Sequence, residues 1–597
     1  MTTVILAEKP DQAKKYAKAL GQAKWDNDCW RVTNSTFGEL VIVSSVGHIV
    51  HMENPLKQYE NWNLNNLPVF PKEFNYRISS GKRKVFSTIK REVDRADTVI
   101  IGTDPGREGE AIAYRILEKI PKAMSKVKWR LWCNSLSKQG IQKSFSQLLP
   151  ASQTVNLYHE ATARHISDWL VGYNLSPFTT IKMKKDGLLG EQDKAMSVGR
   201  VQTPIVNLIV ENDESISNFS SMAFYKVQLL DKENDLTFTN RDIFHTCEEA
   251  DEVVKSLSTT ARVAEVSIEI VEKSAPELFD LSDLQAHMSK YFQWSADKTL
   301  AVAQQLYDKE VTSYPRTDYK TITNFEFLYL NQPGYVERLS TGIDMVGFEK
   351  KKETLSSHYV DDEQTGEHHA IIPTDTFPNQ TEYFFDTDEI ILYKEIAKRT
   401  LLMFEGDYVY EKRKVILENN GYEFSTTGAQ LVSKGWRKFV PSIRQLKFLS
   451  EEFEVGQAVE IEKTWIQDET KPPKRITEAD LLSTILKKFR LGTAATRAEI
   501  LKKIFERQYL VKDKKTGQLF PLDRGKKLIY FLKQFDIMYT NIETTKIWEE
   551  TLVRIGRGEI QKEQFILQVK MAIAKQIEEV IHQERYKDLG SSYHSSS

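Results

Sequence analysis

Cysteine is scarce in this 597-residue chain, and its scarcity excludes two ways of stabilising a small domain. Cys29, Cys133 and Cys247 are too scattered for CxxC metal knuckles or a disulfide framework, so we expect no zinc site. No window approaches the roughly 18 apolar residues of a membrane span. The first residues also lack the basic stretch that leads into a signal-peptide core. These absences predict a reducing, cytoplasmic location and no membrane partner.

The sequence also lacks a phosphate-binding loop and a strong net charge. No GxxxxGK[ST] string occurs, so we expect no ATP site of that kind. The net charge of −2 neither indicates nor excludes a polyanionic partner, because local patches matter more than the sum. Basic residues interleaved with apolar and aromatic residues cluster at 180–187, 486–490, 495–518 and 523–527. These clusters fit either solvated helix faces or a surface that binds phosphates.

Short apolar runs alternate with helical patterns in the first 150 residues. The apolar runs cover 3–8, 39–48 and 96–104, and the helical patterns cover 11–20 and 107–120. This alternation predicts a parallel α/β domain. Functional residues gather at the carboxyl ends of strands in such sheets. Because Glu8 ends the first run and Asp104 ends the third, we expect both carboxylates at one rim of the sheet.

Helical and strand-rich segments alternate over longer distances in the rest of the chain. Helical patterns dominate residues 150–210 and again from 475, whereas 222–275 and 403–465 favour strands. A helical block lies between the two strand-rich segments. A strand-rich domain that is interrupted and then resumed predicts that residues 276–402 are an insertion, able to serve as a lid or gate.

Two strings carry residues suited to chemistry, and each also has a structural explanation. In TDPGREGEAIA, the acids Asp104, Glu108 and Glu110 flank a Pro-Gly pair that suits a type II turn. The acids either stabilise a helix N-terminus or, with Glu8, bind Mg²⁺. VTSYPRTDYK is either a surface turn or an extended segment in which Tyr314 and Arg316 share a face as a nucleophile and an anion-binding cation.

Several longer strings, in order along residues 1 to about 560, resemble those of type IA DNA topoisomerases. The resemblance is strongest to the bacterial DNA topoisomerase III branch. The strings include ILAEKP, SVGHIVHM, TDPGREGE, ARHISDWLVGYNLSP, SVGRVQTP, SYPRTD, HHAIIPTD and LGTAATRAEIL.

The resemblance implies a multidomain protein of α/β, α and β parts that together form a toroid. It predicts a Toprim α/β metal-binding domain (1–150), a winged-helix-like helical DNA-binding domain (151–215 and 469–585), a β-rich arch (216–275 and 403–468) and an inserted helical gate domain (276–402). Residues 586–597 are expected to form a disordered tail.

The resemblance also implies a reaction, which is ATP-independent, transient cleavage of one DNA strand. Tyr314 would attack a backbone phosphate, keep the 5′ end as a phosphotyrosine and release a 3′ hydroxyl before strand passage and religation. Such an enzyme relaxes negative supercoils, decatenates DNA, or does both. The other implied catalytic residues are Arg316, Lys9, Glu8 and His368, of which the histidine titrates in the useful range.

The implied metal site departs from the family pattern at one position. The family's acidic cluster usually reads Asp-x-Asp-x-Glu, but here the second Asp position is Gly106. Glu8, Asp104 and Glu108 remain, which is enough for one Mg²⁺ ion and makes a second ion unsupported. We therefore expect a single Mg²⁺ ion.

The implied partner is DNA, preferentially single-stranded or negatively supercoiled. The residues expected to contact it are His48, Arg164, His165, Asp168, Tyr173, Arg200, Gln202, Arg316, Thr496 and Arg497. We expect a monomer in the bacterial cytoplasm, associated with the nucleoid or a plasmid, that could act with a helicase partner.

Two other functions remain open from the residues. A Toprim nuclease or primase-like enzyme would use Glu8 and Asp104 without a covalent intermediate. A non-catalytic DNA-binding module could have kept the fold, and Gly106 favours this alternative. SYPRTD and its long upstream match favour the topoisomerase over the nuclease, and the intact Glu8, Lys9, Tyr314 and Arg316 argue against the non-catalytic module.

Overall fold

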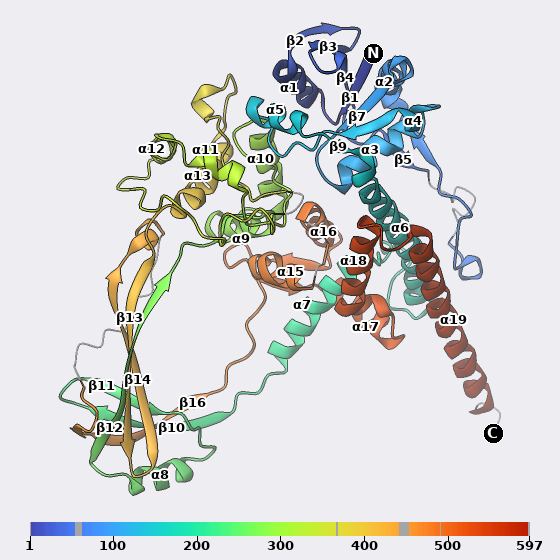
Figure 1. The fold of residues 1–597 in the computed structure, drawn as a ribbon. Helices are drawn as coiled ribbons and strands as arrows, with labels where there is room; N and C mark the ends of the chain where they lie inside the picture. Colours follow the sequence, from blue (N-terminus) through green and yellow to red (C-terminus); the bar gives the residue numbers. More distant parts are fainter. Residues whose placement is uncertain are drawn as a thin grey trace.

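The chain folds into an α/β domain, a helical domain, a separate sheet and an inserted helical block (Figure 1). The structure is a computed structural model, and it describes residues 2–53, 62–365, 368–440, 453–489, 491–492 and 494–594. Among these residues, no helix combines the length and apolar character needed to cross a membrane.

The α/β domain is built on a seven-stranded sheet of order β2-β3-β4-β1-β7-β8-β9. Its strands are β1 (Thr2–Ala7), β2 (Gln22–Asp26), β3 (Cys29–Asn34), β4 (Gly38–Ser44), β7 (Thr98–Gly102), β8 (Val127–Arg130) and β9 (Leu149–Pro150). Its main helices are α1 (Pro10–Leu20), α2 (Arg83–Arg95), α3 (Arg107–Leu117) and α5 (Lys138–Ser146). The short helix α4 (Ala123–Lys126) and the hairpin β5 (Val50–Met52) and β6 (Tyr76–Ile78) complete the domain.

The centre of this sheet confirms the predicted parallel strands. β1 pairs in parallel with both β4 and β7, and its side chains are almost all buried. Glu8 and Asp104 therefore follow neighbouring strands at one rim. The antiparallel β2-β3 hairpin and the edge strand β9 were not predicted.

A buried arginine supports the loop at this rim. Arg130, at the end of β8, is fully buried, and its guanidinium forms an ion pair with Glu110 on α3. It also donates to the carbonyl oxygens of Thr103 (2.9 Å) and Asp104 (2.8 Å). Glu110 therefore has a structural role, and Arg130 fixes the loop that carries Asp104.

The helical domain joins two segments that are far apart in the sequence. The first contributes α6 (Val155–Lys185) and α7 (Gln202–Ser217). The second contributes α14 (Glu478–Asp480), α15 (Leu486–Lys488), α16 (Ala494–Glu506), α17 (Asp523–Gln534), α18 (Ile542–Gly556), α19 (Lys562–His594) and the hairpin β17 (Leu510–Lys512) and β18 (Leu519–Pro521). Both segments share one apolar core that includes Leu170, Val206, Leu501 and Leu552.

The C-terminal tail differs from its prediction. Residues 586–597 were expected to be disordered, but the backbone is helical as far as His594, as a continuation of α19. The last three residues lie outside the described residues. Because α19 packs against α6, the helix begins on a folded surface and then extends past it.

The second sheet combines strands from both strand-rich segments, in the order β15-β12-β13-β14-β11-β10-β16. The strands are β10 (Ala223–Asp231), β11 (Leu236–Asn240), β12 (Thr260–Lys273), β13 (Tyr408–Asn419), β14 (Tyr422–Ser433), β15 (Ala458–Glu460) and β16 (Glu462–Glu469), and α8 (Cys247–Ser256) packs beside them. β12 pairs with β13 and β10 pairs with β16, as expected for one domain that carries an insertion. We call this sheet and α8 the arch.

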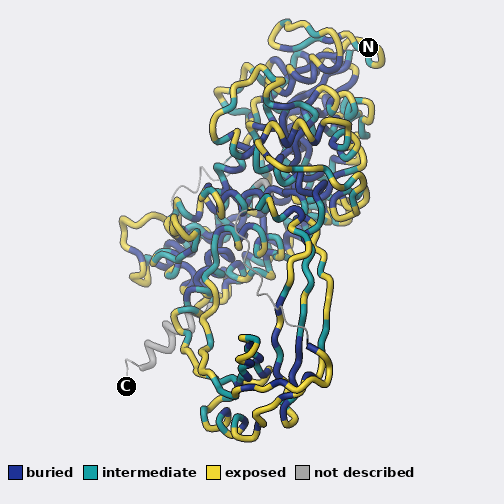
Figure 2. The backbone as a smooth tube through the Cα atoms, turned by 90° about the vertical axis from the view of Figure 1, so that its left-hand side faces the viewer, coloured by how far each residue is buried: buried dark blue, intermediate teal, exposed yellow. Residues whose placement is uncertain are grey.

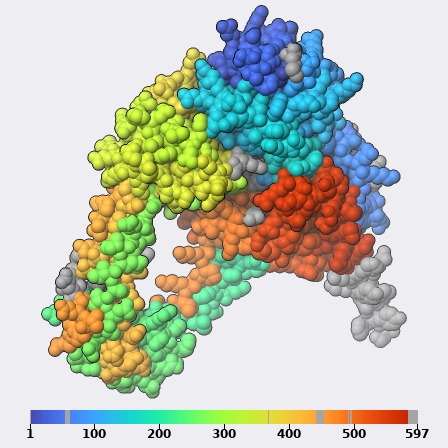
Figure 3. Space-filling model, viewed as in Figure 1, coloured from blue at the N-terminus to red at the C-terminus, as the bar shows by residue number. Residues whose placement is uncertain are grey.

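The inserted block lies between β12 and β13 and has its own apolar core. Its helices are α9 (Leu281–Phe292), α10 (Ala296–Asp308), α11 (Asn324–Leu330), α12 (Tyr335–Gly342) and α13 (Thr387–Leu402). Figure 2 shows that buried backbone is concentrated in the body of the molecule, whereas the arch stands apart and carries long exposed stretches. In Figure 3 the block lies directly against both the α/β domain and the C-terminal part of the helical domain. The arch therefore reaches the block without covering these two contacts.

Candidate active site

Glu8 and Asp104 meet at the rim of the α/β sheet. The Asp104 N–H donates to Glu8 Oε2 (3.2 Å), and Gln12 Nε2 donates to Asp104 Oδ1 (2.9 Å). Burial and the Asp104 charge raise the pKa of Glu8 to about 8, and burial likewise raises the pKa of Asp104. Two carboxyl groups this close favour a shared proton or a cation over two bare charges. Glu8 can therefore carry a proton at neutral pH.

Glu108 does not join these two carboxylates. It lies in the first turn of α3, and its Oε2 is 3.7 Å from His48 Nε2. Among the described residues, no three His, Cys, Asp or Glu side chains come together as a metal-binding group. The three predicted ligands nevertheless line one hollow, and carboxylate oxygens are the donors that Mg²⁺ prefers. The donor set therefore fits Mg²⁺, but Glu108 must turn away from His48 to complete it.

Gly106 adopts a backbone conformation that glycine favours strongly. A type II turn needs a positive φ and a ψ of about 0° at this residue. The φ of Gly106 is positive, at 122°, but its ψ is 172°, so the predicted type II turn is wrong. A Cβ at this position would lie 3.7 Å from His368 Nε2, which leaves room for a side chain. The backbone alone would strain an aspartate here.

Tyr314 lies in an extended segment that follows α10 and contacts the α/β domain. Its N–H donates to the Asn134 carbonyl (3.0 Å), and its ring packs edge-on against Tyr307 (5.3 Å between centroids). Only 5% of the residue is exposed. Burial and the Asp104 charge raise the pKa of the phenol well above 10, while Arg316 opposes them. The hydroxyl is therefore protonated at neutral pH.

Two cations accompany the tyrosine. Arg316 lines the same hollow as Tyr314, which confirms that they share a face, and its buried Nε has no hydrogen-bond partner among the described residues. Lys9 Nζ is 3.2 Å from Asp308 Oδ1 at the end of α10. The Lys9 charge also reaches Glu8 and Asp104. A phosphate in the hollow would lie beside the Arg316 guanidinium.

His368 packs against the ring of Tyr314. Its ring centroid is 5.1 Å from that of Tyr314, it stacks on Trp132, and its Nδ1 is 2.9 Å from Asn134 Oδ1. Burial, helped by the charge of His369, lowers the pKa of His368 to about 3. The expectation that this histidine titrates near neutrality is therefore wrong in this structure, because the buried imidazole stays neutral.

Two arginines share one buried carboxylate beside the hollow. Arg164 on α6 donates to both carboxylate oxygens of Glu549 on α18 (2.8 and 2.6 Å). Arg200 donates to the same Glu549 (2.6 Å) and to Asp168 (2.8 Å). Burial raises the pKa of Glu549, but the two arginines outweigh it and hold that pKa well below its usual range. Arg164 Nε and Arg200 Nη2 are buried without partners among the described residues.

The hollow has a volume of about 680 Å³ and collects most of the predicted site residues. It is lined by Glu8, His48, Asp104, Glu108, Arg164, Asp168, Arg200, Tyr314, Arg316 and Thr496. Three predicted DNA contacts lie elsewhere. His165 lies 3.3 Å from Arg115, Tyr173 stacks on Trp169 (4.6 Å between centroids), and Gln202 bonds to Ser197 and Arg507.

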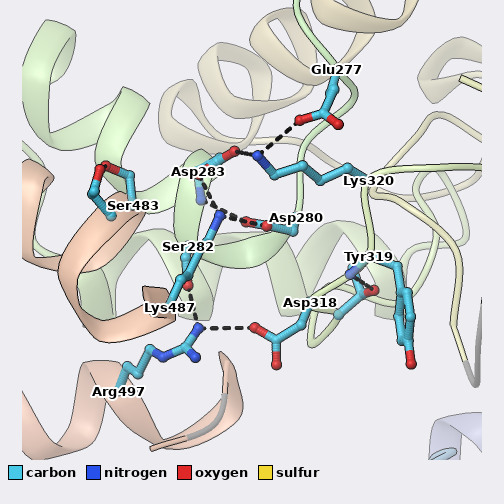
Figure 4. Close-up of polar contacts among 12 residues, drawn as sticks. Glu277, Asp280, Ser282, Asp283, Asp318, Tyr319, Lys320, Ser483, Lys487 and Arg497 are labelled. Carbon is cyan, nitrogen blue, oxygen red and sulfur yellow. Dashed lines mark hydrogen bonds and ion pairs between the residues drawn. The ribbon is translucent and has the colours of Figure 1, made fainter. Parts of the chain in front are cut away.

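Arg497 is also turned away from the hollow. Its Nη1 donates to Ser282 (2.7 Å) and Asp318 (2.9 Å) of the inserted block (Figure 4). Beside it, Lys487 forms ion pairs with Asp280 and Asp283 of the same block. Arg497 therefore joins the helical domain to the inserted block in this structure.

Three residues of the site escaped prediction from the sequence. Asn134 holds both Tyr314 and His368, Asp308 holds Lys9, and Glu549 holds the arginine pair. Each of these three residues lies 180 residues or more along the sequence from the residues that it holds, so no local pattern marks it.

Comparisons with known proteins identify the family and the fold. The DNA topoisomerase family matches residues 152–567, and the Toprim domain matches residues 3–136. DNA topoisomerase 3 of Bacillus subtilis is 30% identical, with 97% of this chain and 82% of that protein covered. DNA topoisomerase 1 of Alkalihalophilus pseudofirmus is 29% identical, with 96% and 84% covered. The full-length topoisomerase I of Thermotoga maritima shares the fold, with a TM-score of 0.70, 21% identity, and 96% and 90% covered.

The shared carboxylate gives a testable role to Glu549. Replacing it with glutamine leaves two buried guanidinium groups without their common counter-charge, which should lower stability by about 3–5 kcal/mol. Phosphates of a bound single strand would replace that charge. We therefore expect Glu549→Gln to melt at a lower temperature than the wild type and to gain more from a saturating oligothymidine.

Glu543→Gln is the matched control, because Glu543 lies on the same helix with an exposed side chain. It should melt and respond to DNA as the wild type does. An equal DNA-induced shift in Glu549→Gln and the wild type would show that the arginine pair does not receive phosphates.

Proposed function

The chain belongs to the type IA DNA topoisomerase family, and we propose that Tyr314 is the residue through which it cuts one DNA strand. The supporting observation is the position of Tyr314, buried between two domains and lining one hollow with Glu8, Asp104 and Arg316. A nuclease or primase-like enzyme without a covalent intermediate would not need a tyrosine there. We further propose that the enzyme passes a strand through the break and reseals it.

Cleavage exchanges one phosphate ester for another. The Tyr314 hydroxyl passes its proton to water in the hollow and attacks phosphorus, the bond to the 3′ oxygen breaks, and that oxygen takes a proton as it leaves. In the metal-free site Glu8, whose pKa of about 8 lets it hold a proton at neutral pH, is suited to donate it. A bound Mg²⁺ ion would displace that proton, and the 3′ oxygen would then take its proton from water. The phosphotyrosine conserves the energy of the phosphodiester, so rejoining reverses these steps without ATP.

The neighbouring residues stabilise the phosphate rather than transfer protons. Arg316, with its unpartnered Nε, would neutralise charge that develops on the phosphate oxygens. Lys9 adds a second positive charge at the rim. His368 is neutral and fixed by Asn134, so we assign it a hydrogen bond to the phosphate through Nε2.

Mg²⁺ would be held by Glu8 and Asp104, with Glu108 completing the set after it leaves His48. When bound, it would supply positive charge beside the phosphate oxygens. The position taken by Gly106 removes one acid from the usual cluster, so we propose a single ion. The carboxylates that hold the ion also set the orientation of Gln12 and of the Asp104 loop.

The bound strand would follow the arginine-lined hollow. Arg164 and Arg200 line this hollow with positive charge, and beyond it Tyr173 on Trp169 offers a stacked ring for a base. We propose that the arch, the inserted block, the α/β domain and the helical domain form a toroid that admits a second strand. We also propose that the protein is a monomer in the bacterial cytoplasm and prefers single-stranded or negatively supercoiled DNA. It would relax supercoils, decatenate DNA or do both, and it could act with a helicase.

The tyrosine assignment predicts a specific loss. Tyr314→Phe should form no covalent adduct with a single strand and should bind that strand almost normally, because only the nucleophilic oxygen is removed. Tyr307→Phe is the control, since Tyr307 packs on Tyr314 and donates to the Cys133 carbonyl at a distance of 3.3 Å. It should still form the adduct. A denaturing gel with end-labelled DNA measures both, and adduct with Tyr314→Phe contradicts the assignment.

The metal assignment predicts a shifted Mg²⁺ requirement. Asp104→Asn removes one charge of the carboxylate pair, so relaxation of supercoiled plasmid should need at least about tenfold more Mg²⁺. Glu118→Gln, which changes an acid bonded to Tyr158 at the far end of α3, should titrate as the wild type does. Identical titrations for Asp104→Asn and the wild type would show that Asp104 is not a ligand.

A further inference from the structure

The inserted block contains a hollow of its own, apart from the active site. Its volume is about 580 Å³, within the range of small-ligand sites. It shares no lining residue with the arginine-lined hollow at Tyr314. Its walls are α12, the first half of α13 and parts of the segment 377–385 that precedes α13. We call it the block hollow.

Most of the side chains that line the block hollow are apolar or aromatic. They are Leu339, Phe377, Pro378, Phe385, Ile390 and Tyr393. Leu339, Phe377 and Tyr393 are buried and belong to the apolar core of the block. Ile390 is 45% exposed, so apolar surface continues from this core to the mouth of the hollow. The hollow can therefore take an apolar group out of water, which is favourable.

The block hollow also carries a cation that no carboxylate holds. Arg338 on α12 lies over the Phe377 ring, 5.5 Å from its centroid, and makes no ion pair among the described residues. The second cation of the lining, Lys394, is held by Asp344 (2.7 Å). Glu337 is the only acid among the described residues of the lining. Because adjacent residues of a helix point in different directions, a ligand can bind Arg338 without meeting Glu337.

The segment that forms one wall of the block hollow also contacts the α/β domain. Two parts of it line the hollow, Pro378–Gln380 and Phe385, and Tyr383 lies between them in the sequence. Lys15 Nζ on α1 is 5.5 Å from the centroid of the Tyr383 ring, and the same Nζ is 3.4 Å from Glu310 just past α10. A ligand that packs against both parts of the wall would hold Tyr383 in its docked position.

A lysine joins the same wall to the end of α10. Lys309 Nζ lies 4.8 Å from the centroid of the Phe385 ring, donates to the Phe384 carbonyl (2.7 Å) and pairs with Glu389 of α13 (2.6 Å). The preceding residue, Asp308, holds Lys9 of the α/β domain. A ligand in the block hollow would therefore act on this boundary through Phe385 and Lys309 as well.

We propose that the block hollow binds a small amphipathic acid, a molecule with one aromatic or aliphatic group and one carboxylate. The apolar group packs against Phe377 and Tyr393, and the carboxylate binds Arg338. The bound acid stabilises the docked arrangement of the inserted block and slows its separation from the α/β domain. This effect on turnover rests on the proposed function, whereas the binding itself does not.

The binding test compares naphthylacetate with the neutral naphthylacetamide, which carries the same apolar group. Equilibrium dialysis against the full chain without DNA should give a dissociation constant about two- to fivefold lower for the acid, because an exposed ion pair contributes modestly. Arg338→Gln should remove this difference. Lys298→Gln is the control, because Lys298 is a cation of the same block outside the hollow, with a side chain 40% exposed. It should keep the wild-type difference.

A larger side chain tests the location of the site. Gly342, the last residue of α12, lines the block hollow, and a Cβ there would meet no atom within 4 Å. Gly342→Trp should therefore fold normally, fill the hollow and remove measurable binding of both probes. Gly81→Trp is the matched control, because a Cβ at Gly81 in the α/β domain also meets no atom within 4 Å. It should bind both probes as the wild type does.

The effect on the reaction is tested by measuring relaxation and adduct formation side by side. Saturating naphthylacetate should slow relaxation of supercoiled plasmid by the wild type roughly fivefold or more. It should leave the rate of adduct formation with a single strand unchanged, because cleavage occurs in the docked arrangement. Gly342→Trp should relax plasmid at one rate with and without the acid.

Equal binding of the acid and the amide by the wild type, or unchanged binding by Gly342→Trp, overturns the proposed site. Binding that leaves relaxation unchanged overturns the stabilising role, and so does adduct formation that slows as much as relaxation. The dialysis uses no DNA, so its result does not depend on the proposed function. Absence of adduct from the wild type, or its presence in Tyr314→Phe, instead contradicts the proposed function.

Discussion

The hydrogen bond from the Tyr314 N–H to the Asn134 carbonyl is the contact on which the active site depends. It joins the inserted block to the α/β domain, and Asn134 also holds His368 through its side chain. Lys9 and Asp308 form an ion pair across the same boundary. The tyrosine and the carboxylates therefore meet only when the two domains are docked. Separation would move the nucleophile away from Glu8 and leave a cut strand unable to reseal until the domains close again.

The proposed strand passage requires the boundaries of the inserted block to separate. The inserted block has its own buried core, and partly exposed ion pairs such as Lys9 with Asp308 cross its boundary with the α/β domain. Partly exposed ion pairs contribute little to stability, about 0–1 kcal/mol each. Water can hydrate both partners when the boundary opens. Apolar contacts also cross the boundaries, since Tyr314 and Tyr307 pack into a core cluster of the α/β domain and Ala296 packs into the core of the helical domain.

Local patterns in the sequence predicted the parts of the structure that follow from one strand, one helix or one motif. The two acids at the sheet rim came from strand alternation, and the insertion came from the order of helical and strand-rich segments. Contacts between distant segments could not be predicted in this way. Glu549 lies 385 residues from Arg164, and only the packing of α18 on α6 brings them together. The low pKa of His368 and the position of Arg497 likewise depend on burial between domains, which no local pattern encodes.

The most direct measurement joins the two domains covalently, away from the chemistry. Lys143 on α5 lies over the Phe325 ring on α11, with Nζ 3.1 Å from the ring centroid. Lys143→Cys and Phe325→Cys, combined with Cys247→Ser, can be linked with a short cleavable bis-maleimide. The linked protein should form the covalent adduct with a single strand at the unlinked rate but relax no supercoiled plasmid until the linker is cut. Relaxation by the linked protein at the unlinked rate would contradict the account.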